Sequence, residues 1–339
     1  HIISRLDPEL KYQVKSSLNY PEDSAGRIMS RDFVSIPDNW TVREARQYLL
    51  NNEELPDDFY TIFLVDEKTL KPTGEIALDK LLRAKGDEKL NSIMDGEIVP
   101  VDVYTDQEEV AHMFREYGWM SAMVVDNKGR LIGVINIDDV VEIVHEETNE
   151  DMMLLTGAES NDVYRSVFSI FKSRSIWLVT NLFATIVAAS VVGEFQDIIA
   201  QLSILAVLMP IVASMGGTTG QQTLAVVVRS LATKELNSRN ALRMIGKEFM
   251  VGLCNGLLFA VMIGIAVRIW FPGQEMISYI IALAMLCNLT VASLAGILIP
   301  LTINRLKIDP AIASGVFLIA CTDSGGYFIF LGLAKLLLF

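Results

Sequence analysis

The chain has 339 residues, 51% of them hydrophobic, with 41 acidic against 28 basic side chains. Its two halves differ, because residues 1–150 hold 31 acidic and 16 basic side chains whereas residues 151–339 hold 10 and 12. The negative field of the first half argues against nucleic acid or anionic lipid as its partner and for cations. Cys254, Cys287 and Cys321 all lie in apolar segments, which excludes a disulfide framework.

The first half contains one α/β pattern twice. "RIMSRDFVSIPDNWTVREARQYL" resembles "SIMDGEIVPVDVYTDQEEVAHMF", and "TIFLVDEKTLKPTGEIALDKLL" resembles "SAMVVDNKGRLIGVINIDDVVEIV". Each unit predicts strand, helix, strand, turn, strand and helix, with a hairpin glycine at Gly74 or Gly133. Such a pair resembles tandem CBS (Bateman) domains, at 26–90 and 91–148. The alternative is an ordinary α/β domain in which the similarity between the two segments is accidental.

The CBS resemblance implies a ligand site after each hairpin glycine. CBS pairs often hold an adenine nucleotide, such as ATP, through a hydroxyl residue and an aspartate there. In this chain Ala77 and Asn136 replace the hydroxyl residue, Asp79 falls one place early and Asp139 is in register. Asp79 and Asp139 are therefore the candidate nucleotide residues, and the departures weaken the prediction of ATP binding.

Acidic residues crowd the end of the first half. Residues 91–150 carry 14 acidic and three basic side chains, many of them in "NIDDVVEIVHEETNED". The plain interpretation is a solvated acidic face. Hard divalent ions prefer oxygen ligands, so the other interpretation is a cation-sensing surface that closes when the ion is abundant. The candidate ligands of a regulatory metal are Asp95, Asp138, Asp139, Glu142, Glu146, Glu147 and Glu150.

The second half breaks into hydrophobic segments long enough for a hydrocarbon core of about 30 Å. There are five of them, at 175–195, 198–228, 245–271, 276–303 and 310–338. The second contains Pro210 and "SMGGTTGQQ". These residues predict a kinked or broken helix, which is tolerated only where it faces protein or water.

Loop charges predict the orientation of the spans. Positive side chains follow only the second and fourth segments, at Arg229, Lys234, Arg239, Arg243, Lys247, Arg305 and Lys307. The positive-inside rule then puts the N-terminal half in the cytoplasm and the C-terminus outside. We therefore expect a multi-pass protein in a lipid bilayer.

Asp323 is an ionisable residue inside the last apolar segment, where an unpaired carboxylate costs several kcal/mol. It belongs to "IDPAIASGVFLIACTDSGGYF", which follows "HEETNEDMMLLTG" and "MPIVASMGGTTGQQ" along the chain. Together these motifs resemble the MgtE magnesium transporters and channels. Residues 1–25 resemble only the end of that family's helical N-terminal domain, most of which is missing. Thr218 and Gln221 stand where many members have asparagine.

The resemblance implies a multidomain membrane protein, in which the α/β CBS pair precedes an all-α domain of five transmembrane helices at 175–339. It further implies a homodimer in the bacterial inner (cell) membrane, with a central Mg²⁺-selective pore. Cytosolic Mg²⁺ would close this pore through a connecting plug helix at 149–174. Asp309, before the last span, would share a regulatory ion with that helix. The expected ion pathway consists of Asp323, Gly216, Gly217, Thr218, Gln221 and Asn288.

Several alternatives stay open. Asn181 and Asn288 suit interhelical packing as well as a pore, and Glu248 is expected near the membrane interface. Another divalent ion such as Co²⁺ or Mn²⁺ could be the cargo, although the motifs lack the soft ligands that would favour it. A CBS membrane sensor that transports nothing is the remaining alternative. An enzyme is not expected, because the chain has neither HExxH nor a P-loop.

Overall fold

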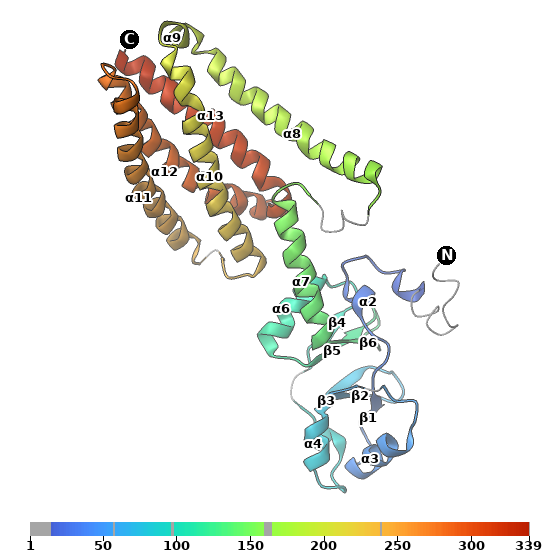
Figure 1. Ribbon diagram of the computed structural model, residues 1–339. Helices are drawn as coiled ribbons and strands as arrows, with labels where there is room; N and C mark the ends of the chain where they lie inside the picture. Colours follow the sequence, from blue (N-terminus) through green and yellow to red (C-terminus); the bar gives the residue numbers. More distant parts are fainter. Residues whose placement is uncertain (1–14, 57, 96–97, 159–164, 238, 339) are drawn as a thin grey trace. The chain divides into compact units, whose positions relative to one another are not determined.

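The computed structural model describes residues 15–56, 58–95, 98–158, 165–237 and 239–338 (Figure 1). The chain divides into two compact units, residues 1–148 and 149–339. The first fourteen residues of the predicted N-terminal remnant lie outside the described residues.

The first unit contains two three-stranded sheets of the same design. In each, a parallel pair of strands is followed by an antiparallel hairpin. The first sheet has β1 (Ser35–Pro37), β2 (Thr61–Val65) and β3 (Pro72–Ala77), with helices α3 (Val42–Asn51), α4 (Leu78–Arg83) and α5 (Leu90–Ile93). The second has β4 (Val101–Asp102), β5 (Ser121–Val125) and β6 (Leu131–Asn136), with α6 (Gln107–Tyr117) and α7 (Ile137–Leu154).

Local chemistry explains where these elements begin and end. The Thr41 side chain accepts a hydrogen bond from Glu44 N at 3.3 Å while Glu44 Oε2 accepts one from Thr41 N at 2.7 Å, a capping box that starts α3. Gly118 ends α6 with a φ of 67°, a conformation that glycine adopts without strain. The predicted hairpin glycine Gly133 pairs with Val124 across β5 and β6.

Each repeat completes its core with a segment that precedes the other repeat. Helix α2 (Ala25–Ile28) comes before the first sheet, yet Ala25 and Met29 pack in the core of the second. Met29 also covers Gly133, where a Cβ would meet its side chain at 2.6 Å. Met94 covers Gly74 in the same way, also at 2.6 Å.

Among its described residues, the second unit has five helices that are long and apolar enough to cross a membrane, which agrees with the predicted number. They are α8 (Val167–Gly193), α10 (Ile204–Ala232), α11 (Ala241–Trp270), α12 (Glu275–Arg305) and α13 (Pro310–Leu338), with the short α9 (Gln196–Gln201) between the first two. Figure 1 shows α12 beside α10, α11 and α13, and each of those three helices contacts it. Helix α8 packs chiefly on α13.

Two details of the predicted helices need correction. The predicted second span is broken, but the break lies at Leu202–Ser203 between α9 and α10, and α10 continues through Pro210 and the glycines. The helical residues of the predicted connecting helix at 149–174 belong to two other helices, and residues 155–158 and 165–166 are not helical. Its beginning completes α7, and Val167 starts α8, which runs on into the first span.

Candidate functional site

One face of α10 is polar and exposed. Ser214, Thr218 and Gln221 are exposed in the chain and recur at helical spacing, so they lie on one side of the helix. We call these three residues the polar face of α10. Other residues of α10 pack inside the bundle, among them the buried Val212, Gly216 and Gly220.

Asp323 lies at the height of this polar face. A Cβ on Gly216 would meet Asn288 Nδ2 at 2.5 Å, and one on Gly326 would meet Asn288 Oδ1 at 3.1 Å, so α10 and α13 flank the same amide. Further along α10, Gly220 approaches Leu318. The two helices therefore run antiparallel, which brings Asp323 level with Thr218. The Asp323 side chain is partly exposed.

Two of the predicted pathway residues have packing roles. Asn288 is 1% exposed, and its Nδ2 donates a hydrogen bond to Val212 O at 2.7 Å, which ties α12 to α10. Gly216 is buried against this amide, whereas a Cβ on Gly217 would meet nothing within 4 Å. The bond to Val212 O fits the alternative in which Asn288 serves interhelical packing, and its place in the ion pathway stays a prediction. Gly217 stays a predicted pathway residue.

Glu248, which the sequence places near the membrane interface, was not among the predicted site residues. Its side chain is buried among the helices, and Oε2 accepts a hydrogen bond from Thr223 Oγ1 at 2.9 Å. An acidic residue eight positions into a long apolar helix is the only sign of it in the sequence.

Four predicted metal ligands share one side of α7. Asp138, Glu142, Glu146 and Glu150 are exposed at four-residue intervals, and we call them the acidic face of α7. Like charges at this spacing repel each other. Within the described residues of one chain, no three His, Cys, Asp or Glu side chains are grouped closely enough to hold a metal ion.

The other predicted ligands lie elsewhere. Glu147 accepts a hydrogen bond from Gln107, and Asp95 forms an ion pair with Lys80. Burial raises the pKa of Asp139, and the nearby charges of Asp138 and Glu142 raise it further. Asp309 Oδ1 accepts a hydrogen bond from Ala311 N at 2.8 Å at the start of α13. The predicted set is therefore not one cluster.

The nucleotide prediction divides between the two repeats. Counted from the hairpin glycines, Lys80 occupies in the first repeat the position that Asp139 occupies in the second. Lys80 forms an ion pair with Asp95. Asp79 lies on the surface, with its Oδ2 3.7 Å from Arg83 Nη2. The first repeat thus places a paired cation where the pattern requires a carboxylate, which argues against Asp79 as a ligand.

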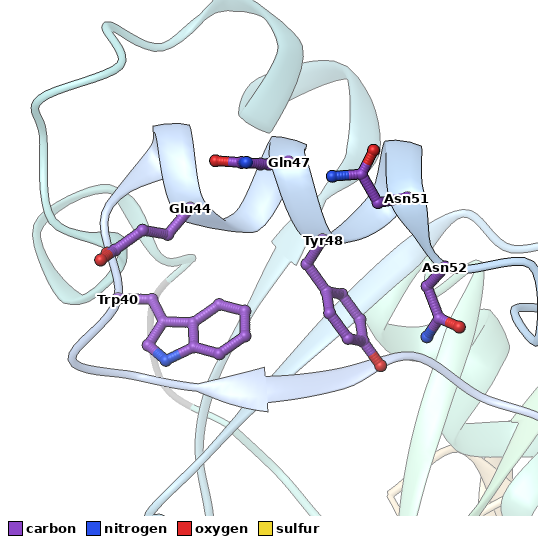
Figure 2. A pocket seen from close by; sticks show the side chains of 6 residues that line it. All are labelled: Trp40, Glu44, Gln47, Tyr48, Asn51 and Asn52. Carbon is purple, nitrogen blue, oxygen red and sulfur yellow. The ribbon is translucent and has the colours of Figure 1, made fainter.

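A shallow pocket lies on the first repeat, beside α3 (Figure 2). Its wall includes the rings of Trp40 and Tyr48, whose centroids are 5.6 Å apart in an edge-to-face arrangement. Glu44 also lines it, and hydrogen bonds from Thr41 lower the pKa of that carboxyl. None of the predicted site residues lies here, and the capping box already uses Glu44.

Comparison with known proteins identifies the family. The MgtE family profile, described as a divalent cation transporter, matches residues 209–333, and the CBS profile matches residues 25–87 and 90–146. The magnesium transporter MgtE of Enterococcus faecalis is 33% identical over 324 residues, which cover 96% of this chain and 71% of that protein. Its Bacillus subtilis counterpart is 30% identical over 333 residues, or 98% of this chain and 73% of that one.

Among solved structures, the crystal structure of the cytosolic domain of the Mg²⁺ channel MgtE in complex with ATP is similar, with 33% identity. It covers 42% of this chain and 57% of that chain, with a TM-score of 0.39. The curated relatives match along nearly the whole chain, through the CBS pair and the five apolar helices alike. The chain therefore belongs to the MgtE family, as a multi-pass membrane protein with a CBS pair.

Proposed function

We propose that two copies of this chain form a pathway for Mg²⁺ across the cell membrane. The observation that supports it best is the polar face of α10 at the height of Asp323. A polar face on a spanning helix is unfavourable against lipid, so it faces a water-filled path or another protein surface. A twofold axis beside α10 and α13 supplies both, because each copy covers the other.

The chemistry of this path suits a hydrated divalent cation. Two copies of Asp323 place two carboxylates near the axis, and Thr218 and Gln221 add hydroxyl and amide oxygens. Mg²⁺ gives up its water reluctantly, so these groups hold it through hydrogen bonds to its hydration shell. The relatives are named magnesium transporters, and we assign the same cargo here.

We assign the N-terminal half to the cytoplasm and the C-terminus to the outside. The connection between α10 and α11 carries Lys234 and Arg239, and the one between α12 and α13 carries Lys307. The opposite connections lack Lys and Arg. This asymmetry is the signature of the positive-inside rule.

Cytosolic Mg²⁺ is the proposed regulator. The acidic face of α7 repels itself, and a divalent cation held by one or two carboxylates and water relieves that repulsion. The last residues of the same helix belong to the second unit, in which Leu154 and the following Leu155 pack on a cluster that includes Leu224 of α10 and Leu318 of α13. A change in α7 thus reaches the two helices that line the path. A nucleotide such as ATP would be held in the second repeat, at Asp139.

The test is Mg²⁺ flux into proteoliposomes, with internal Mg²⁺ either absent or at millimolar level. We expect flux in the wild type without internal Mg²⁺, its suppression by internal Mg²⁺, and its loss in Asp323→Ala. Asp197→Ala, which removes an exposed carboxylate from α9, is the matched control. Normal flux in Asp323→Ala would refute the pathway, and flux that ignores internal Mg²⁺ would refute the regulation.

A further inference from the structure

The hydrogen bond between Glu248 and Thr223 joins α11, which lies away from the proposed path, to α10, which lines it. Both side chains are buried, with 9% and 5% exposed, and Thr223 Oγ1 donates to Glu248 Oε2 at 2.9 Å. An ionisable side chain inside a membrane bundle is unfavourable unless it is bonded. Its position at this contact therefore calls for an explanation.

Thr223 lies on the side of α10 opposite to the polar face. Nine residues separate it from Ser214, and at about 100° per residue this places the two about 180° apart. A bond that fixes Thr223 therefore fixes the direction in which Thr218 and Gln221 point.

The contact between α10 and α12 on that side is close. A Cβ on Gly296 of α12 would meet Gly220 O at 2.6 Å and Thr223 Cβ at 2.8 Å, so the two backbones pass near each other beside Thr223. Two side-chain hydrogen bonds tie α10 to its neighbours in addition to this packing, one from Asn288 to Val212 O and one from Thr223 to Glu248. They bracket the glycine-rich part of α10.

We propose that Glu248 is a positioning residue of the ion pathway, which sets the rotation of α10 through Thr223. Glu248 itself does not touch the ion. It holds the back of α10, and the front of the helix then presents its hydroxyl and amide groups to the path. This inference rests on the proposed function, because it concerns the alignment of the same pathway.

The first test compares Mg²⁺ flux in three single variants. Thr223→Val removes the donor at nearly constant volume, and we expect flux to fall about tenfold, the scale of one hydrogen bond to a carboxylate. Thr223→Ser keeps the donor and should restore most of the flux. Ser293→Ala is the matched control, because this buried hydroxyl on α12 has no hydrogen-bond partner among the described residues.

The second test measures the rotation directly, by labelling cysteines on α10 with a water-soluble thiol reagent in a chain whose native cysteines are alanine. With Thr223 intact, Thr218→Cys should react and the buried Thr219→Cys should not. Adding Thr223→Val, or Glu248→Ala, should make Thr219→Cys reactive. Glu248→Gln retains an acceptor oxygen and should preserve the original pattern.

The outcomes separate this inference from the function on which it rests. A wild type without flux would overturn the proposed pathway. Wild-type flux together with normal flux in Thr223→Val would overturn the role of Glu248 alone. Reduced flux with an unchanged labelling pattern would also overturn it, because the bond would then act on something other than rotation.

Discussion

Glu75 is a carboxyl whose surroundings work against its charge. It lies on β3, and burial, followed by the negative charge of Asp95, raises its pKa. Asp95 is itself paired with Lys80, and Asp95 N donates to Glu75 O at 2.8 Å, so the three residues form one contact between the segment before the second repeat and the first sheet. Ionisation of Glu75 therefore disfavours the folded state.

This environment predicts a pH-dependent effect of Glu75→Gln. Because the folded-state pKa is raised, Glu75 stabilises the fold only below its unfolded pKa of about 4.3, and that stability is lost as the pH rises through the folded value. At pH 7 the variant should gain roughly 0.5 kcal/mol, and at pH 4 it should gain little. Thermal unfolding of the purified protein at both pH values measures this. The exposed Glu67→Gln should change neither, and an equal gain at both would contradict the assignment.

Single residues differ in how far the sequence could reveal their roles. The shared side of Thr218 and Gln221 on α10 could be predicted from their helical spacing, and their place in the ion pathway stays a prediction. The hydrogen bond of Asn288 could not be predicted, since the sequence shows an amide but not the carbonyl that it meets 76 positions away. The hydrogen bond between Glu248 and Thr223 could not be predicted for the same reason.

At the scale of elements, the crossing of α10 and α12 depends on Gly296. A Cβ there would lie 2.6 Å from Gly220 O and 2.8 Å from Thr223 Cβ, so the helices would have to separate. Gly296→Ala should therefore lower stability by about 1–3 kcal/mol, the usual cost of overpacking. The thermal unfolding midpoint in detergent measures it. Gly246→Ala, with open space around the added methyl group, should be neutral or slightly stabilising, and equal losses in both would argue against close packing.

Trp177 of α8 packs on the segment that follows α7, at residues 155–157. Gly157 has a φ of 73°, and a Cβ there would overlap the Trp177 indole, while Gly315 of α13 approaches the same ring and Leu155 O. Trp177→Ala should loosen this contact and leave several-fold more flux at high internal Mg²⁺, about the effect of 1 kcal/mol. Flux measured across internal Mg²⁺ concentrations tests it. Trp270→Ala, an exposed tryptophan on α11, should gate normally, and a normal response in both would exclude the role.

The existence of a helix could be predicted where its length and hydropathy determine it. The residues at which a helix begins and ends were harder to predict. The five apolar runs marked five helices because each exceeds what a core helix needs. The separate connecting helix was wrong because no glycine or proline interrupts the chain from Val167 into the span, so α8 has no reason to stop. In the same way α7 continues to Leu154, since the first breaker after it is Gly157.

At the scale of the molecule, the repeats were predictable but their exchange of segments was not. Strand and hairpin patterns occur twice in order, which indicates two copies of one unit. A linear division assigns α2 and Met29 to the first repeat or to the remnant before it. The structure instead packs them in the second core, because the hairpin glycine of each sheet leaves a space that the other repeat's leading segment fills.

The proposed pathway needs a second copy of the chain. If the polar faces of two α10 helices flank a common axis, Thr218→Cys in one chain lies near its equivalent in the other. Mild oxidation in membranes should then give a disulfide-linked dimer from Thr218→Cys, in a background without native cysteines. Leu257→Cys is the control, because Leu257 is exposed on α11 among apolar side chains and should face lipid. If neither cysteine variant cross-links although the protein migrates as a dimer, the twofold axis lies away from α10. Cross-linking of Leu257→Cys alone would place α11 at the axis, and the polar face of α10 would need another cover.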